Sequence, residues 1–294
     1  AVSHTFIGES KCGIHHLMDS INIFIGWLND PPLERFASWG KNVLKGDFGT
    51  SITYKQQVST VILERFKYSI VLMLVAWCFS GIVGFLIGIL AGIYKGSLFD
   101  KIIKIFCLAL QSAPTFWIGL LILSLFSVYL GWFPIGFAVP MGKLSLEITI
   151  WDRIYHLILP ALTLSILGIS RVTLFTRQKL IEILNSDFIL FAKARGENTR
   201  QLVIRHGLRN IALPAITEQF ASFSELFGGI ALAETVFSYP GLGTATTAAG
   251  LNGDVPLLLG IAIFSAIFVF VGNFIANILY GVLDPRLKEG KYNG

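Results

Sequence analysis

Charged side chains are scarce in this chain of 294 residues, and their scarcity excludes an ordinary soluble domain. They make up 14% of the sequence, against 54% hydrophobic residues, whereas a typical soluble domain is about 25% charged. The mean hydropathy is +0.69. The net charge of +5 does not indicate nucleic-acid binding, because the basic residues cluster beside apolar stretches, as in membrane proteins. The composition predicts an integral membrane protein that uses its whole length as one helical bundle.

Cysteine is also rare, and its spacing excludes a disulfide framework. Cys12, Cys78 and Cys107 show no paired spacing. Cys78 and Cys107 lie in apolar stretches, so buried thiols are predicted there. Cys12 stands near His15 and His16, but no further ligands accompany them at a useful spacing, so no metal site is predicted. We find no Ser-His-Asp arrangement or paired acids, so no catalytic residue and no enzyme active site are expected on this chain.

A phosphate-binding loop for nucleotides is lacking as well. Gly-Lys pairs at residues 40–41, 142–143 and 290–291 have neither the preceding glycine spacing nor the following Ser or Thr of that motif. If ATP drives this protein, another chain must bind it, and we expect no cofactor on this one.

Five predominantly apolar stretches are long enough to cross a bilayer, which takes about 20 residues. They predict an all-α polytopic membrane protein. The stretches are Tyr68–Tyr94, Ile105–Leu130, about Tyr155 to Phe175, about Ile211 to Ala233, and Pro256–Leu283. Pro114 interrupts the second stretch. In the first, Gly81, Gly84, Gly88 and Gly92 recur at helical spacing, which predicts close helix packing.

Lysine and arginine are unevenly distributed among the segments between these stretches. They concentrate in residues 95–104, in residues 171–209 and at the end of the chain, which predicts that these segments and the tail 288–294 are cytoplasmic. The loops 131–153 and 235–255 hold few or none, so they are predicted to lie outside.

Five spans then place residues 1–67 outside the membrane as an extracytoplasmic region, followed by a membrane domain over residues 68–287. Residues 1–25 show no basic-then-apolar signal pattern. We therefore expect a sixth, N-terminal span that is missing from, or unrecognisable in, this sequence. The alternative is a five-span protein that inserts without a leader.

The segment Asp187–Pro214 is polar and strongly basic, although it lies between two apolar spans. Charge is costly inside a bilayer, so this segment is expected in water on the cytoplasmic side. Asp187 can cap the N-terminus of a short helix. Residues 192–196 read Ala-Lys-Ala-Arg-Gly: the alanines favour a helix, and the glycine permits a sharp turn. A generic amphipathic loop is the alternative interpretation.

A motif in this segment resembles the EAA loop of ABC importer permeases. Its matching residues are Ala192, Lys193, Ala194, Arg195, Gly196 and Leu208. The resemblance implies that residues 187–209 form a coupling loop whose helix docks on an ATPase subunit. The sequence departs from the motif at Leu190, where the family has Glu, and at His206 and Arg209.

Five further motifs, in order along the chain, resemble those of the peptide/nickel class of these permeases. They are Gly46–Ser51, Ser112–Trp117, His156–Leu162, Glu234–Gly243 and Leu283–Arg286. The resemblance extends over residues 33–287, whereas residues 1–30 resemble nothing that we can place. It implies the transmembrane domain of an ABC importer in the cytoplasmic (inner) membrane of a prokaryote, with a cytoplasmic C-terminus.

The resemblance also implies ATP-driven transport by alternating access. The implied partners are a second homologous permease, two ATPase subunits that hold ATP and magnesium, an extracytoplasmic solute-binding protein and membrane lipid, but no nucleic acid. Peptides are the cargo that the class favours, and nickel or a metal chelate is the alternative. An ATP-independent carrier or channel, and a non-transporting membrane sensor or assembly component, stay open as other classes of function.

Two carboxylates lie inside the fourth predicted span. Glu218 and Glu225 are seven residues apart, which places them on one face of a continuous helix. Acidic residues in membrane helices usually face a cavity or a partner, so both are candidates for the translocation path and for contact with a cationic or zwitterionic solute. Interhelical hydrogen bonding is the alternative. Glu225, within Ser224–Gly229, resembles a glutamate of nickel-type members, which adds modest weight to the alternative of a metal or metal-chelate cargo.

The segment Glu234–Gly243 is expected to form a turn on the outer side, since Pro and Gly punctuate it. The residues assigned to an external gate or turn are Glu234, Phe237, Tyr239, Pro240 and Gly241. A purely structural turn is the alternative. Asn273 and Asn277 in the last span are predicted to bond neighbouring helices.

Overall fold

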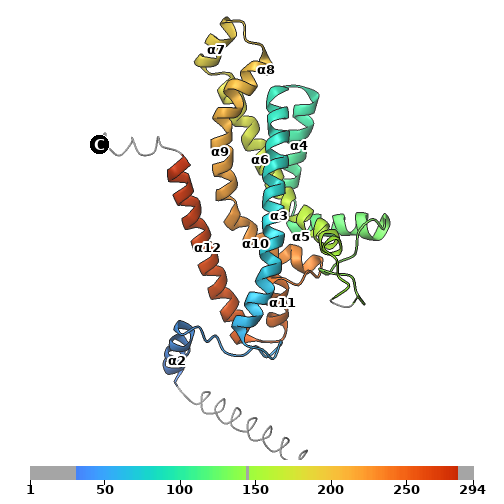
Figure 1. The fold of residues 1–294 in the computed structure, drawn as a ribbon, viewed down its shortest axis with the longest axis vertical. Coiled ribbons are helices and arrows are strands. Elements are labelled where there is room, and N and C mark those ends of the chain that lie inside the picture. The colour runs from blue at the N-terminus through green and yellow to red at the C-terminus, as the bar shows by residue number, and fades with distance from the viewer. Residues whose placement is uncertain (1–30, 144–145, 284–294) are drawn as a thin grey trace, which may run out of the picture.

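The computed structural model describes residues 31–143 and 146–283, which form helices joined by loops (Figure 1). The first half contains α2 (Pro32–Leu44), α3 (Val58–Ile93), α4 (Leu98–Ser112), α5 (Thr115–Leu123), the π-helix η1 (Ser124–Tyr129) and α6 (Ile150–Leu184). The second half contains α7 (Asp187–Ala194), α8 (Thr199–Gln201), the π-helix η2 (Leu202–Gly207), α9 (Leu208–Ala221), α10 (Phe223–Val236), α11 (Leu242–Leu251) and α12 (Val255–Leu283). Three sequence features lie outside the described residues: Cys12 with His15 and His16, most of the motif Leu283–Arg286, and the tail 288–294.

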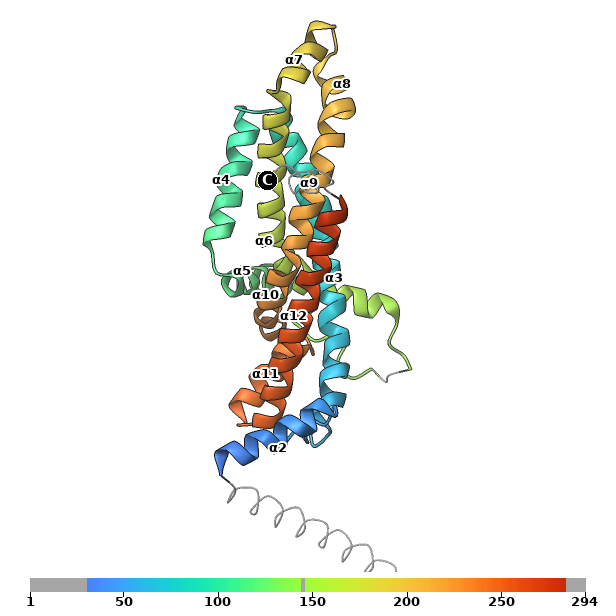
Figure 2. The same cartoon turned by 90° about the vertical axis from the view of Figure 1, so that its left-hand side faces the viewer.

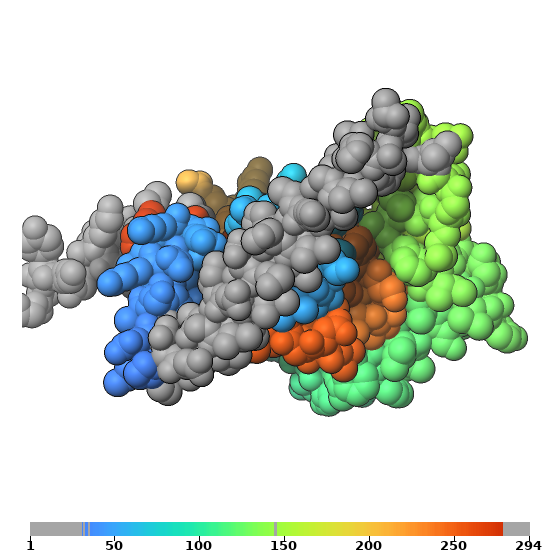
Figure 3. All heavy atoms as spheres, turned by 90° about the horizontal axis from the view of Figure 1, so that it is seen from below, coloured from blue at the N-terminus to red at the C-terminus, as the bar shows by residue number. Residues whose placement is uncertain are grey.

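The long helices run along the length of the molecule, and short helices lie at its two ends and, as α5 and α10, near its middle (Figures 1 and 2). α7 and α8 lie at one end, and α2 and α11 at the other. From below, α11 and the start of α3 are seen together at the second end (Figure 3). A buried apolar cluster, which includes Val58, Leu242 and Leu257, joins α3, α11 and α12 there. The predicted cytoplasmic loop therefore lies at the opposite end of the molecule from α11, the helix that follows the predicted outer turn.

Within the described residues, three helices are long and apolar enough to cross a membrane: α3, α6 and residues Val255–Ile278 of α12. α4 together with residues Thr115–Tyr129 passes the same test as a pair that is bent by 109°. α3 begins ahead of the predicted start at Tyr68, and α6 continues past the predicted end at Phe175. Both helices therefore carry charged turns beyond their apolar runs.

Two of the predicted spans are interrupted. α4 ends at Ser112, because Pro114 lacks an amide hydrogen and favours extended backbone at Ala113, where φ is −89° and ψ is 139°. The fourth predicted span divides at Ser222 into α9 and α10. The Ser222 hydroxyl donates to the carbonyl oxygen of Gln219 at 2.8 Å, a bond that competes with the helical ladder. The prediction of one continuous helix in this stretch is therefore wrong.

Glycines allow α3 to pack directly against α6. A Cβ atom built on Gly84 would lie 2.8 Å from the Cβ atom of Val172, and one on Gly88 would lie 2.7 Å from the carbonyl oxygen of Thr173. The Thr173 hydroxyl donates to the carbonyl oxygen of Gly84 at 3.2 Å. The prediction of close helix packing is confirmed for these positions, whereas Gly81 faces α9 instead.

Replacing Gly88 with alanine is expected to destabilise the bundle by about 1–3 kcal/mol, because the added methyl group overpacks the α3–α6 contact. The thermal unfolding midpoint of the purified protein measures this effect. Gly228→Ala is the matched control, since Gly228 is also helical but a Cβ atom there has no neighbour within 4 Å. A Gly88→Ala midpoint at or above that of the parent would contradict the packing argument.

Candidate functional site

The end formed by α7 and α8 holds the predicted coupling residues (Figure 1). The buried side chains Ile189 and Ala192 of α7 pack with Leu202, and Ile183 and Leu184 at the end of α6 pack against the same cluster. One face of α7 is therefore fixed to the end of α6 and to the segment that leads into α9.

Gly196 turns the chain between α7 and α8. Its φ is +91°, and a Cβ atom built there would meet nothing within 4 Å, so the turn requires glycine for its backbone conformation rather than for space. Asn198 then begins α8 with a capping box. Its side chain accepts a hydrogen bond from the Gln201 amide at 2.9 Å, and the Gln201 side chain accepts one from the Asn198 amide at 2.9 Å.

The outward side of this end is both apolar and basic, and we call it the coupling face. Its exposed residues are Phe188, Leu190, Phe191, Lys193, Ala194, Arg195 and Ile204. Phe191 is 75% exposed. Leu190, a departure from the EAA pattern, adds to the apolar part of this surface. Large apolar side chains that gather on a surface mark interaction sites.

Two contacts of Glu197 that were not predicted from the sequence close the coupling loop. The Nε2 atom of His206 lies 3.1 Å from Oε2 of Glu197, and Nη2 of Arg195 lies 3.4 Å from Oε1 of Glu197. The Asn210 side chain donates to the carbonyl oxygen of His206 at 2.7 Å. His206, which departs from the motif, is thus bonded within the loop, and the matching Leu208 begins α9 in a half-buried position.

An ion pair joins α6 to α10 in the middle of the bundle. It is formed by Arg171 and Glu225, whose side chains are 43% and 61% exposed. A cavity of about 80 Å³ adjoins the pair and is also lined by Thr115 and Ser222. Glu218, which precedes the interruption at Ser222, is half-buried and does not line this cavity. The structure therefore gives Glu225 a partner and places Glu218 apart from that site.

Glu234, near the end of α10, is fully buried. Its carboxylate accepts hydrogen bonds from the Ser69 hydroxyl at 2.5 Å and from the Gly243 amide at 2.6 Å. The Ser69 hydroxyl oxygen in turn accepts one from the Leu242 amide at 2.8 Å. One carboxylate therefore joins α3, α10 and the start of α11.

The other residues assigned to the outer turn surround this carboxylate. A Cβ atom built on Gly241, which follows Pro240, would overlap the Glu234 carboxylate. Phe237 and Tyr239 are buried, and the carbonyl oxygen of Phe237 accepts a hydrogen bond from the Phe137 amide at 2.9 Å. This geometry is that of a packed structural connection, and a role as an external gate stays a prediction.

The motif Gly46–Ser51 is tied to the start of α12 by Asp254. The Asp254 carboxylate accepts hydrogen bonds from the Ser51 hydroxyl at 2.6 Å, the Thr53 amide at 2.9 Å and the Leu257 amide at 3.2 Å. Burial raises the pKa of Asp254, but these hydrogen bonds outweigh burial and hold the pKa below its usual value. Asp254 thus stays ionised as the anchor of this outer loop.

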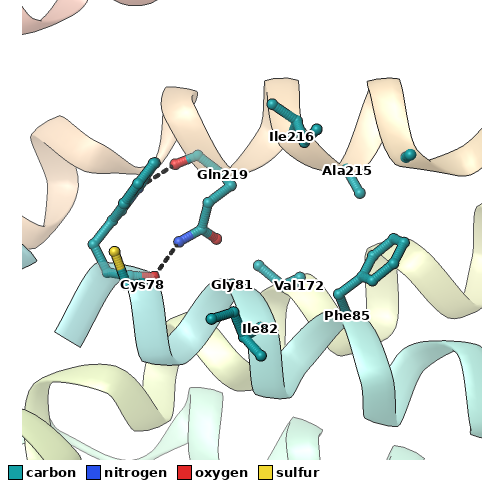
Figure 4. A pocket seen from close by; sticks show the side chains of 10 residues that line it. Cys78, Gly81, Ile82, Phe85, Val172, Ala215, Ile216 and Gln219 are labelled. Atoms are coloured by element: carbon teal, nitrogen blue, oxygen red, sulfur yellow. Dashed lines mark hydrogen bonds between the residues drawn. The ribbon is translucent and has the colours of Figure 1, made fainter. Parts of the chain in front are cut away.

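A second, larger cavity lies between α3 and α9 (Figure 4). Its volume is about 370 Å³, and its lining is mostly apolar. Trp77 Nε1 donates to the carbonyl oxygen of Gln219 at 2.8 Å, and Gln219 Nε2 donates to the carbonyl oxygen of Trp77 at 2.7 Å. These reciprocal bonds attach α9 to α3. Cys78 lines this cavity and is exposed, so the prediction of a buried thiol is wrong there, whereas Cys107 is buried as predicted.

The comparison with family models decides the family. Residues 84–289 match the model of the binding-protein-dependent transport system inner membrane component. The chain belongs to this family. The resemblance that its motifs predicted is thereby confirmed, and the chain is a multi-pass membrane protein of the permease type.

Curated relatives of this permease are similar over most of its length. The oligopeptide transport system permease protein AppB of Bacillus subtilis is 37% identical over 262 residues, which cover 89% of this chain and 82% of that protein. The dipeptide transport system permease protein DppB of Escherichia coli is 30% identical over 282 residues, covering 90% of this chain and 83% of that protein.

Among solved structures, an inward-facing MetNI methionine ABC transporter has a similar fold. The TM-score is 0.60 at 14% sequence identity, and the match covers 76% of the permease and 96% of the other chain. This likeness supports the fold alone. It agrees with the all-α membrane bundle that the sequence predicted.

Proposed function

We propose that this permease is the transmembrane subunit of an ATP-driven importer that moves peptides across the cytoplasmic membrane by alternating access. The coupling face carries the proposal, because it exposes large apolar and basic side chains at one end of a membrane bundle. Peptide cargo is supported by the two curated relatives, which are named as peptide permeases.

The proposal includes the partners that such an importer needs. Two ATPase subunits bind ATP and magnesium and dock on the coupling faces of this chain and of a second, homologous permease. A solute-binding protein delivers cargo on the outer side. The C-terminal tail then lies in the cytoplasm, on the side of the ATPase subunits.

The buried side of α7 provides a route for coupling. Ile189 and Ala192 pack against the end of α6 and against Leu202, ahead of α9, so a displacement of α7 acts on both helices. α6 carries Arg171, and Glu225 lies on α10, which follows α9. Two ATPase states that contact the coupling face differently would bias the permease between two conformations by that difference in free energy.

Reconstitution of the permease with and without its ATPase subunits tests this proposal. We expect uptake of a labelled tripeptide into proteoliposomes only when the ATPase subunits, ATP with magnesium and the binding protein are all present. Uptake by the permease alone would support the ATP-independent carrier or channel instead. Uptake of nickel or a nickel chelate, but not of peptide, would support the metal alternative.

Gly196→Val is expected to lower ATP-driven uptake about tenfold, while membrane insertion and ATP hydrolysis persist. The positive φ of Gly196 would cost a β-branched residue about 1–3 kcal/mol, and relief of that strain moves α7 from its position. Tenfold corresponds to about 1.4 kcal/mol. Gly196→Asn is the matched control, since asparagine tolerates positive φ better and should retain most uptake. Normal uptake by Gly196→Val would contradict the coupling assignment.

A further inference from the structure

The Arg171–Glu225 pair lies deep in the membrane region of the bundle. Val172, the residue after Arg171, faces Gly84 of α3, and Gly84 falls near the middle of the uncharged run Tyr68–Tyr94. A charged side chain at that depth is costly in lipid. Both side chains are nevertheless partly exposed on this chain, so the surface that they form must face water or a partner protein rather than lipid.

Two interrupted helices converge on the same place. Thr115 begins α5 directly after the bend at Pro114, and Ser222 separates α9 from α10. Both residues line the cavity of about 80 Å³ beside the ion pair. Irregular backbone at membrane depth is tolerated where it is buried in protein or lines a water-filled cavity, and interrupted helices often form the substrate sites of transporters. Charge and backbone geometry therefore point independently to one site.

We propose that Arg171 and Glu225 bind the two charged ends of a zwitterionic peptide. This inference rests on the proposed function as a peptide importer. In the empty site, the guanidinium and the carboxylate neutralise each other. In the loaded site, Glu225 binds the N-terminal ammonium of the peptide and Arg171 binds its C-terminal carboxylate, so one ion pair is replaced by two.

The balance of charge explains why this site selects zwitterions. A cationic solute on Glu225 would leave Arg171 without its partner, and an anionic solute on Arg171 would do the same to Glu225. Either solute would exchange one ion pair for another and leave one of the two charges without a partner at membrane depth, where unpaired charge is costly. A neutral solute gains nothing by opening the pair. Because Arg171 and Glu225 stand on different helices, α6 and α10, their separation depends on how the two helices are placed.

Gly228 provides a reporter for this site. It stands one helical turn from Glu225 on α10, is exposed, and has no neighbour within 4 Å of a built Cβ atom. The full transporter with Gly228→Cys, and with Cys12, Cys78 and Cys107 replaced by serine, is placed in nanodiscs and treated with a charged maleimide. Free tri-alanine is expected to slow the labelling about tenfold, the effect of about 1.4 kcal/mol of binding, whereas N-acetylated, C-amidated tri-alanine leaves it unchanged. Gly250→Cys in α11, equally unobstructed, is the reference position that peptide should not protect.

Variants of Arg171 and Glu225 test whether these residues recognise the peptide ends or only stabilise the fold. With Glu225→Gln, N-acetylated and free tri-alanine should protect Gly228→Cys equally, because the group that distinguishes the N-termini is gone. With Arg171→Gln, the C-amidated and free peptides should become equivalent. Glu182→Gln is the matched control: it removes the surface ion pair with Lys179 on α6 and should leave both discriminations intact.

Several outcomes would overturn the inference. They are failure of the charged reagent to reach Gly228→Cys, equal protection by free and doubly capped peptide in the parent, or variants that lower folded yield but still discriminate the peptide ends. ATP-driven tri-alanine uptake, measured with the same preparation in proteoliposomes, distinguishes the two proposals. If the parent does not take up tri-alanine, the importer proposal is wrong. If it does, but free and capped peptides protect Gly228→Cys equally, only the proposed binding site is wrong.

Discussion

Replacing Gly241 with valine is expected to abolish the accumulation of folded permease. A Cβ atom at this position would overlap the carboxylate of Glu234, which is fully buried and bonded to Ser69 and Gly243. Overpacking at this position costs about 1–3 kcal/mol, and each buried polar group left without a hydrogen-bond partner costs about 1–3 kcal/mol more. Together these costs are a large part of a total stability of about 5–15 kcal/mol. Size-exclusion chromatography of the detergent-solubilised, fluorescently tagged protein measures the folded yield.

The control for this experiment lies in the same part of the fold. Gly250 is helical and exposed in α11, where a Cβ atom meets nothing within 4 Å, so Gly250→Val should give nearly the yield of the parent. Glu234→Gln keeps the shape of the side chain and should lose less than Gly241→Val. A monodisperse Gly241→Val protein with the parental unfolding temperature would show that Glu234 does not hold the outer connection together.

Phe191→Asp is expected to abolish ATP-driven uptake while the permease itself stays folded. The Phe191 side chain is 75% exposed, so the bundle does not depend on it, but the proposed docked state would bury it. A charge in the centre of such an interface removes an aromatic anchor, and truncation of such an anchor typically costs 2 kcal/mol or more, about thirtyfold in affinity. Co-purification of the ATPase subunits with the tagged permease measures the loss directly.

Leu251→Asp is the matched control for the coupling face. Leu251 is also a highly exposed apolar residue, but it ends α11 at the opposite end of the molecule. Its variant should retain the ATPase subunits at the parental ratio. If Phe191→Asp retained the ATPase subunits, the docking surface would not lie on α7. Equal loss of the ATPase subunits from both variants would indicate a general defect in folding or assembly.

The parts of the fold that sequence predicts well are those that one physical rule controls. α3 and α12 follow from long uncharged runs, and the bend after α4 follows from Pro114, whose ring cannot continue a helix. The glycines of α3 also predict close packing, because small residues at helical spacing let a neighbouring helix approach the backbone. At these places, the residues that favour the local structure are also the residues that the packed fold requires.

The features that escaped prediction depend on contacts between distant segments. Glu234 was assigned to an external gate or turn, yet it is buried and bonded to Ser69, which lies 165 positions away in the sequence. Glu225 was predicted to share a helix face with Glu218, but the interruption at Ser222 and the cation of Arg171 on another helix give it a different environment. No local pattern specifies such pairings, so they follow only from the assembled fold.

The interruption at Ser222 divides one apolar stretch into two helices, α9 and α10, that are attached to different parts of the molecule. α10 is held by Glu234 to Ser69 of α3 and to the start of α11, whereas α9 continues from the coupling loop. In the proposed importer, a displacement at the coupling face would therefore change the angle between α9 and α10 rather than shift one long helix. Because the break at Ser222 lies beside Arg171 and Glu225, a small tilt of α9 would change the distance between these two charges.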